Sequence, residues 1–499
     1  MANSAVINAV GLTSRAFRAV RGGKSAFAAA LEFARGLPDV DRVVLLTDSA
    51  SSDAVRGAGA EVRVLSDWTI RALIAELGAA SSGREDVFYL FGDCPLLDAE
   101  IARRMYRNHR AYFAEYSFAD GYPLGLTPEI IQTGAIPRIA RLLRDDDGKI
   151  ERDTLFTLIQ RDVNSFDIET EISPKDLRLL RLSLSCDTER NFRIVKALID
   201  AGCSDEGSLL EIIPKRGDLL RSLPAYFEVQ ITDGVSQEVS YSPYPLLFGH
   251  ASQRRGEMAL ARFEKLASDI AQFADDAVIS PSLWGEPALH SSIDAIAAAV
   301  RDRPGLELLL ETSGIGWREG VLERIAESGS DRITWIVDLD ASNPELYRRL
   351  RGEGWETAQA TTEKLLKLFP GRVHVQAVRM HSNEGDLEAF YKYWKERIPN
   401  VIIQKYDWYC GVLPQLKVTD LSPLKRSPCW HLKRDMVILI DGTVPLCRED
   451  LKCEHPQGNV FEEGLADVWA RGQEYHLQHV REEYPPLCRG CDEYYTYNF

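Results

Sequence analysis

Five cysteines near the end of the chain have the residue type and spacing of a metal-binding group. They are five of the nine cysteines among 499 residues: Cys429, Cys447, Cys453, Cys488 and Cys491. The pair Asp441-Gly442 predicts a tight turn that returns the chain so that Cys429 and Cys447 meet. Cys488 and Cys491 are separated by two residues and offer two more thiolates. Four converging thiolates suit either a tetrahedral zinc ion or an iron–sulfur cluster, and spacing alone does not separate the two.

Charge and hydropathy exclude several classes of protein. Acidic residues outnumber basic ones, 75 to 59, which gives a net charge of −16. Such a polyanion is not drawn to a nucleic-acid backbone or to an anionic membrane, so we expect neither as a partner. No run approaches the ~18 apolar residues of a membrane span, and residues 1–10 lack the basic stretch of a signal peptide. The sequence therefore favours a cytoplasmic protein with a small-molecule or protein partner.

Short apolar segments alternate with amphipathic ones, which predicts an α/β fold with mostly parallel sheets. In the first part we expect strands over 5–12, 42–47, 61–65, 86–92 and 180–184, and helices over 25–35 and 191–201. The Gly/Ser/Pro-bearing stretch 203–214 is interpreted as the first boundary. Strands over 226–231, 277–280, 306–311, 333–338, 373–378 and 401–404 then predict a partial or full barrel of parallel strands. A further strand is expected over 436–440. The predicted domains are 1–205, 223–420 and 425–499.

The last segment resembles a SPASM domain, the auxiliary iron–sulfur module that follows radical SAM barrels. The resemblance rests on Pro428-Cys429-Trp430, on residues 441–447 and 458–461, on Val468-Trp469 and on residues 486–491. It implies one auxiliary [4Fe-4S] cluster with Cys429, Cys447, Cys488 and Cys491 as ligands. Cys453 is a spare or alternative ligand.

Residues 223–420 resemble the radical SAM core. Residues 282–290 look like the strand end whose Glu, here Glu286, meets the amino group of S-adenosylmethionine (SAM), and Thr312 lies in the next such motif. The family holds its SAM-cleaving cluster by Cys-x3-Cys-x2-Cys after the first strand. This chain has no cysteine between Cys203 and Cys410, and its equivalents are Ser236, Ser240 and Pro243. We therefore expect no cleavage of SAM.

The first part of the chain resembles cytidylyltransferases of the GT-A nucleotidyltransferase fold. Gly92-Asp93-Cys94-Pro95-Leu96 follows a predicted strand, and an Asp at the carboxyl end of such a strand can hold Mg²⁺ against a nucleotide phosphate. Arg15 remains from the family's phosphate-binding loop, whose glycines and lysine are mostly replaced. The second acidic motif appears as residues 123–127 without its carboxylates, which weakens the expectation of catalysis; Asp120 lies near enough to substitute.

The whole arrangement resembles the spiro-SPASM protein family, which implies an iron–sulfur protein with no assigned reaction. Our first interpretation is a [4Fe-4S] protein that does not cleave SAM and whose first domain binds a nucleotide or nucleotide sugar. The second is a nucleotidyltransferase that uses Asp93, Arg15 and Mg²⁺ to activate a sugar or small acid. The third is a scaffold stapled by Zn²⁺ on the four cysteines, with His455 as a nearby additional donor.

Overall fold

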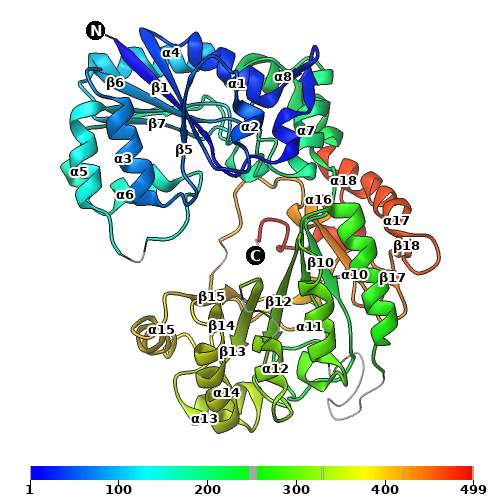
Figure 1. Cartoon of the computed structure of the whole chain (residues 1–499). Coiled ribbons are helices and arrows are strands. Elements are labelled where there is room, and N and C mark those ends of the chain that lie inside the picture. The colour runs from blue at the N-terminus through cyan, green and yellow to red at the C-terminus, as the bar shows by residue number, and fades with distance from the viewer. Residues whose placement is uncertain are drawn as a thin grey trace. The chain divides into compact units, whose positions relative to one another are not determined.

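The chain folds into two compact units, Met1–Ser222 and Leu223–Phe499, each with its own seven-stranded sheet (Figure 1). The computed structural model describes residues 2–496 except 146, 245, 247–255, 328, 330 and 420. The α/β fold class is confirmed: both sheets consist mainly or wholly of parallel strands connected by helices.

The sheet of the first unit has the order β5-β4-β1-β6-β8-β7-β9. Its neighbours are parallel except that β8 runs antiparallel to both β6 and β7. The strands are β1 (Asn3–Ala9), β4 (Val40–Thr47), β5 (Glu61–Val64), β6 (Asp86–Phe91), β7 (Tyr116–Asp120), β8 (Glu129–Gln132) and β9 (Ile168–Ile172). A small hairpin, β2 (Ala19–Arg21) and β3 (Lys24–Ser25), stands apart from this sheet.

Helices cover both faces of this sheet. Successive residues of its central strands point to opposite sides, and apolar residues on both sides pack against helices. Ile7 and Phe88 belong to one apolar cluster, whereas Val6 and Tyr89 belong to the other. The helices are α1 (Ala26–Arg35), α2 (Ser52–Val55), α3 (Ile70–Ala80), α4 (Ala99–Ala111), α5 (Ile136–Arg141), α6 (Thr154–Gln160), α7 (Glu189–Asp200) and α8 (Glu206–Lys215).

Two sequence expectations for this unit are wrong. Residues 180–184 do not form a strand: Arg181 has a left-handed backbone (φ 45°), and only an isolated bridge joins Ser183 to Leu124. The buried side chains of Leu182 and Leu184 explain the apolar pattern without a ladder. Most of 203–214 is helix α8 instead of a boundary, because Asp205 and Ser208 form a capping box that starts the helix.

The sheet of the second unit is parallel throughout, with the order β15-β14-β13-β12-β11-β10-β16 and edges at β15 and β16. Its strands are β10 (Tyr226–Val229), β11 (Ala277–Ser280), β12 (Leu306–Thr312), β13 (Ile333–Asp338), β14 (Val373–Arg379), β15 (Val401–Lys405) and β16 (Asp435–Ile438). The predicted strands β10 to β15 all exist within a few residues of their expected bounds.

The helices that connect these strands pack on one face of the sheet. They are α10 (Leu260–Ala274), α11 (Ile293–Arg301), α12 (Val321–Glu327), α13 (Pro344–Arg351), α14 (Trp355–Leu368) and α15 (Leu387–Lys395). Phe227, Leu310 and Val337 belong to the core that includes these helices. The residue that follows each of them in its strand therefore points to the other face. That alternation places Glu228, Glu311 and Asp338 on the face away from the helices.

The cysteine-bearing end of the chain is joined to this sheet by β16, which pairs in parallel with β10 through Tyr226 and Asp435. After β16 the chain turns at Gly442, whose φ of 91° is a left-handed conformation that favours glycine. A hairpin, β17 (Thr443–Val444) and β18 (Gly458–Asn459), and three helices follow: α17 (Leu465–Arg471), α18 (Gln473–Val480) and α19 (Pro486–Arg489). A short helix, α16 (Trp430–Arg434), precedes β16.

Candidate functional site

Five thiols from separate segments line one small enclosed cavity in the second unit. They are Cys410, Cys429, Cys447, Cys488 and Cys491. Cys410 lies in a 3-10 turn (Tyr409–Gly411) beyond β15, Cys429 precedes α16, and Cys447 follows β17. Cys488 is in α19, and Cys491 comes two residues after its end. The structure therefore brings together the four cysteines singled out in the sequence and adds Cys410.

Burial raises the pKa of the Cys429, Cys447 and Cys488 thiols, because an apolar environment disfavours the thiolate. The hydrogen bond from Cys410 lowers the pKa of Cys491. A bound metal or cluster would deprotonate coordinating thiols and reverse the effect of burial. No three His, Cys, Asp or Glu side chains in the described ranges surround a single-ion position as they stand. The donor set is soft and sulfur-rich, as an iron–sulfur cluster requires.

Cys453 and His455 lie outside the lining of this cavity. The loop that carries them is organised by the Asp450 carboxylate, which accepts hydrogen bonds from the backbone N–H groups of Leu446, Glu454 and His455. The His455 ring packs edge-on against Tyr475. Neither residue therefore faces the thiols, and the position of His455 gives no support to the zinc interpretation.

A second cavity of about 240 Å³ lies at the carboxyl ends of the parallel strands, where ligands of such sheets bind. Acidic side chains from several strands line it: Glu228 on β10, Glu311 on β12, Asp338 on β13 and Asp407 beyond β15. Burial raises the pKa of Glu228 and Asp338, and that of Asp407 to about 6. The sequence analysis missed these residues, although an acid that ends an apolar strand was a usable signal.

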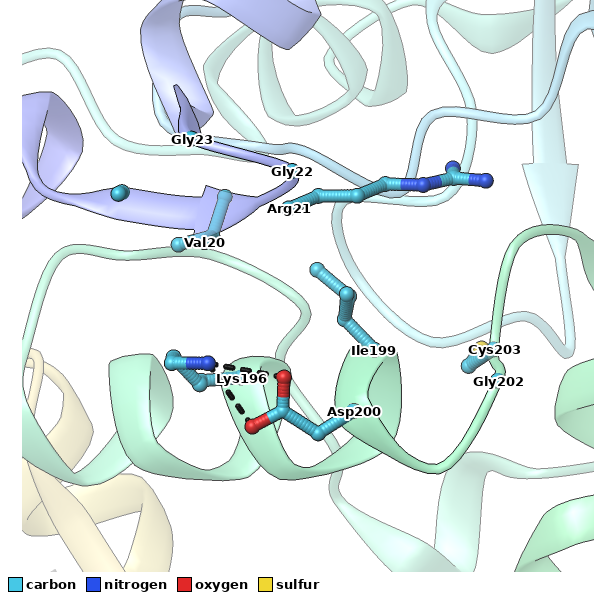
Figure 2. A pocket seen from close by; sticks show the side chains of 10 residues that line it. Val20, Arg21, Gly22, Gly23, Lys196, Ile199, Asp200, Gly202 and Cys203 are labelled. Atoms are coloured by element: carbon cyan, nitrogen blue, oxygen red, sulfur yellow. Dashed lines mark hydrogen bonds and ion pairs between the residues drawn. The ribbon is translucent and has the colours of Figure 1, made fainter.

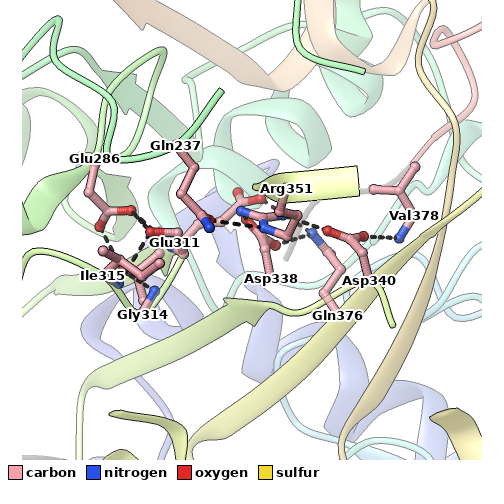
Figure 3. Close-up of polar contacts among 12 residues, drawn as sticks. Gln237, Glu286, Glu311, Gly314, Ile315, Asp338, Asp340, Arg351, Gln376 and Val378 are labelled. Carbon is pink, nitrogen blue, oxygen red and sulfur yellow. Dashed lines mark hydrogen bonds and ion pairs between the residues drawn. The ribbon is translucent and has the colours of Figure 1, made fainter. Parts of the chain in front are cut away.

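Gln376 of β14 connects two of these acids. Its side-chain nitrogen donates to Asp338 at 2.9 Å and to Glu311 at 3.3 Å (Figure 3). Arg351, at the end of α13, lies beside Asp338 in the same view and donates to Asp340 at 2.5 Å. The wall of this cavity is thus a continuous polar network that extends over three strands.

Glu286 lines this cavity as the sequence suggested, but its carboxylate is bound by protein groups. It accepts hydrogen bonds from the Thr312 hydroxyl at 2.6 Å, from the Ser313 backbone N–H at 2.9 Å and from the Ser313 hydroxyl at 2.7 Å. Burial raises its pKa. Glu286 and Thr312, the two predicted SAM-pocket residues, therefore contact each other at the mouth of the sheet.

The loop after β10 contains Ser236, Ser240 and Pro243, which the sequence predicted as the equivalents of the radical SAM cysteines. The Ser236 hydroxyl is 2.9 Å from the Ser313 hydroxyl, and the Ser240 backbone N–H donates to the Leu350 carbonyl. Ser236 and Pro243 line the sheet cavity. A hydroxyl and a proline ring therefore line this part of the cavity, and neither is a good ligand for iron.

Arg448 links the sheet cavity to the cysteine cavity, because it lines both. Its guanidinium lies 3.6 Å from Glu228 and 3.6 Å from Glu449. The Arg448 Nε atom and both carboxylate oxygens of Glu449 are buried without a hydrogen-bond partner among the described residues. A group in either cavity would therefore meet the same cation.

Asp93 of the first unit is buried, and its two carboxylate oxygens bind Arg152 at 3.1 and 2.5 Å. The same guanidinium donates to Asp187 at 3.2 Å. Arg15 donates to the Asp187 backbone carbonyl and pairs with Glu189 at 3.4 Å. The structure thus groups both predicted residues, Asp93 and Arg15, around Asp187, with Arg152 where a cation would lie. Asp120 pairs instead with the exposed Arg178.

Another cavity of this unit, about 360 Å³ in volume, lies between the β2–β3 hairpin and α7 (Figure 2). Arg21 extends along it, and Lys196 is bound to Asp200 at 2.8 Å. None of the predicted site residues lines this cavity.

Two family comparisons match the second unit. Residues 429–492 match SPASM, described as an iron–sulfur cluster-binding domain, and residues 250–393 match the radical SAM superfamily. The chain therefore carries an iron–sulfur cluster-binding domain preceded by a radical SAM domain. The SPASM match includes all the predicted cysteine ligands but not Cys410. Among the described residues no helix is both long and apolar enough to cross a membrane.

Solved structures resemble parts of the chain at TM-scores below 0.5, so no functional argument rests on them. BtrN in complex with AdoMet and 2-DOIA is 18% identical, covers 55% of this chain and 94% of its own, and has a TM-score of 0.39. A cytidylyltransferase from Leptospira borgpetersenii is 19% identical, with coverages of 44% and 96% and a TM-score of 0.38. SuiB of Streptococcus suis bound to its precursor peptide SuiA is 13% identical. The match covers 68% of this chain and 78% of SuiB, with a TM-score of 0.43.

Two proteins of Treponema pallidum (strain Nichols), both called uncharacterised, are similar in sequence. One is 34% identical over 140 residues, which are 25% of this chain and 64% of that protein. The other is 41% identical over 360 residues, which are 69% of this chain and 98% of that protein. The chain, with its radical SAM and SPASM domains, therefore belongs to the same family as this second Treponema pallidum protein.

Proposed function

We propose that this protein holds one auxiliary [4Fe-4S] cluster on Cys429, Cys447, Cys488 and Cys491 and does not cleave SAM. The observation that carries the proposal is the common cavity of these thiols. A cubane cluster takes one thiolate per iron, so four of the five lining cysteines suffice. Cys410, which hydrogen-bonds to Cys491, is then the surplus thiol. When bound, the cluster would supply one-electron transfer.

The loop after β10 supports the second half of the proposal. Cleavage of the sulfonium requires a reduced cluster beside it, and residues 204–409 contain no thiol that could hold one. Ser236 bonds to Ser313, and the Glu286 carboxylate is bound by Thr312 and Ser313. The polar groups at this end of the sheet thus stabilise each other, and the remaining acid-lined cavity is available for a ligand.

The sheet cavity and the cysteine cavity form one functional site in this proposal. Arg448 lines both, so a ligand at the strand ends would be separated from the cluster by one guanidinium. A fixed positive charge beside a cluster stabilises its reduced, more negative state. Arg448 would therefore raise the potential of the cluster and attract an electron-rich part of the ligand.

Metal content of anaerobically purified protein tests the proposal. We expect about four irons and four sulfides per chain and a broad charge-transfer absorption, together with loss of both on replacement of Cys429, Cys447, Cys488 or Cys491 by alanine. Cys453→Ala is the matched control and should keep its iron, because Cys453 does not line the cavity. Zinc in place of iron would overturn the assignment.

SAM turnover tests the second half separately. With SAM and a strong reductant, the protein should form no 5′-deoxyadenosine above the level of the variant without cluster ligands. Formation of 5′-deoxyadenosine in proportion to iron content would show that a SAM-cleaving cluster exists and would contradict the proposal.

The pairing of Asp93 and Asp187 favours a second candidate function, a nucleotidyltransferase in the first unit. Two carboxylates from distant parts of the sequence share one guanidinium, and Mg²⁺ with a nucleotide could take the place of that cation. We expect CTP and Mg²⁺ to bind to the full chain and pyrophosphate to be released with an acceptor sugar or acid. Asp93→Asn should abolish both, whereas Asp162→Asn, at an exposed position, should not. Unchanged activity in Asp93→Asn would refute this candidate.

A further inference from the structure

A fourth cavity, in the first unit, shares Arg152 with the group around Asp93 but otherwise has a different lining. It is about 310 Å³ in volume, in the range of small-ligand sites, and lies between strands β6, β7 and β8 and the start of α6. Neither Asp93 nor Arg15 lines it. No ligand has been assigned to this cavity above.

Five aromatic side chains line it: Tyr89, Phe91, Phe118, Tyr122 and Phe156. Phe118 and Phe156 have ring centroids 4.7 Å apart, and Tyr89 and Phe91 are in edge contact at 5.4 Å. The Tyr89 hydroxyl is already engaged, because it accepts a hydrogen bond from Asn8. These contacts restrict the positions of four of the five rings.

The charges in this wall are negative where they are not already paired. Glu129 and Asp153 line the cavity. Glu129 accepts a hydrogen bond from the Tyr116 hydroxyl, and no cation is paired with it among the described residues. Arg152 also lines the cavity; its guanidinium is bound to Asp93 and Asp187 and lies 4.8 Å from the centroid of the Phe91 ring, which therefore already faces a cation. A carboxylate among aromatic faces attracts a cation that has little hydration to lose.

We propose that this cavity binds an alkylammonium cation, with the rings around its methyl groups and the Glu129 carboxylate against its charge. A quaternary ammonium group meets both demands, because ring faces attract its diffuse positive charge and it needs no hydrogen-bond acceptor. A neutral sugar or base would leave Glu129 either unpaired or protonated. The chemistry of the wall thus selects for charge as well as for size.

Choline and its neutral isostere 3,3-dimethylbutan-1-ol distinguish these ligands on the full-length protein. Calorimetric titration should give saturable binding of choline and at least about tenfold weaker binding of the isostere, the ratio expected for a partly desolvated cation among rings. Equal binding of the two would show that the rings recognise shape alone and would overturn the proposal. Absence of choline binding would overturn it too.

Variants test the assigned residues. Glu129→Gln should weaken choline binding about tenfold while leaving the weak binding of the isostere unchanged, and Phe156→Leu should weaken choline more than the isostere. Glu211→Gln, an exposed carboxylate on α8, is the matched control and should bind like the wild type. Unchanged choline affinity in a folded Glu129→Gln protein would contradict the role of this carboxylate.

The pH dependence gives an independent readout, because choline itself does not titrate. Choline affinity should rise as the pH passes through about 7, the region in which the buried Glu129 ionises. The titratable groups around Glu129 are the Tyr116 and Tyr89 hydroxyls and Asp153, and Arg152 lines the same cavity. Both phenols have a pKa far above this range, so neither titrates here. A choline affinity that is flat between pH 6 and 8 would count against the proposal.

Discussion

Gly285, in the loop after β11, has no room for a side chain. A Cβ at this position would overlap the Thr232 carbonyl, so a substitution must push the loop after β10 away from the loop after β11. We expect Gly285→Ala to lower the free energy of unfolding by about 3 kcal/mol. Eight of the nine tryptophans lie in the second unit, so fluorescence-detected urea unfolding reports on it.

The matched control for this prediction is Gly385→Ala. Gly385 has open space around its Cβ position and no left-handed backbone. Its substitution should change the free energy of unfolding by less than about 0.5 kcal/mol. Equal effects of the two variants would mean that the loop at Gly285 adjusts freely.

Glu129 makes the stability of the first unit dependent on pH. Burial raises its pKa from 4.5 to about 7 in the folded state. Between these values the folded protein keeps a proton that the unfolded chain loses, so stability falls as pH rises, by up to about 1.4 kcal/mol per pH unit. Glu129→Gln should remove this loss. Circular-dichroism unfolding of both proteins at several pH values measures the difference, and parallel curves would contradict the prediction.

Cysteine positions show where reasoning from sequence spacing succeeded and where it stopped. Cys429, Cys447, Cys488 and Cys491 were selected by their spacing and by the resemblance to SPASM, and they line one cavity. Cys410 lies outside that pattern and reaches the cavity because β15 leads the chain to it. Cys453 is near in sequence but turned away by the loop around Asp450. Sequence spacing could not show that Cys410 lines the cavity or that Cys453 does not, because both facts depend on tertiary structure.

Helix α13 is fastened to the strand ends by a buried arginine at its last residue. Arg351 has a side chain 6% exposed and pairs with Asp340, which is 1% exposed. Asp340 also accepts hydrogen bonds from the Tyr241 hydroxyl and from the Val378 backbone N–H. Arg351→Met would leave the buried Asp340 carboxylate without its cation. We therefore expect the free energy of unfolding to fall by about 3–5 kcal/mol.

The same helix provides the control for that prediction. Arg348 pairs with Glu353 at 2.8 Å, but its side chain is 60% exposed. Arg348→Met should cost less than about 1 kcal/mol, because solvent screens exposed ion pairs. Fluorescence-detected unfolding of the two variants separates the cases, and a similar loss in both would show that burial does not govern the energetics of this helix.

Elements were predictable where local pattern decides them. Strands β11 and β13 agree with their expected bounds, because an apolar run buried on both sides has few alternatives. Residues 180–184 have a similar apolar pattern but remain irregular, since Arg181 is left-handed. Residues 203–214 looked like a linker because of Gly207 and Pro214, yet the Asp205 cap starts a helix there. Local composition is outweighed in both cases by specific backbone geometry.

At the scale of the whole molecule, the division into two compact units predicts different behaviour of two fragments. Residues 1–222 contain a complete sheet with apolar clusters on both faces. We expect this fragment to fold alone, with a circular-dichroism spectrum and a cooperative thermal transition of an α/β domain. An unfolded or aggregated fragment would show that its core needs the remainder of the chain.

A chain that ends at residue 428 should behave differently. It lacks β16, whose Met436 and Ile438 are buried in the core of the second unit, and it exposes the edge of β10. We expect the second unit to lose cooperative unfolding, whereas full-length protein with all five lining cysteines replaced by alanine should keep it. Cooperative unfolding of the truncated chain would mean that residues 429–499 are an independent domain.

The pairing of β10 with β16 also determines when the second unit can fold during translation. Tyr226 leaves the ribosome long before its partner Asp435, so one edge of β10 stays unpaired in the nascent chain until residues 435–438 have emerged. Cys488 and Cys491 emerge later still. A cluster that needs these two thiols can therefore form only after residues 488–491 have emerged, and chaperones that bind unfolded chains should associate with the nascent second unit until then.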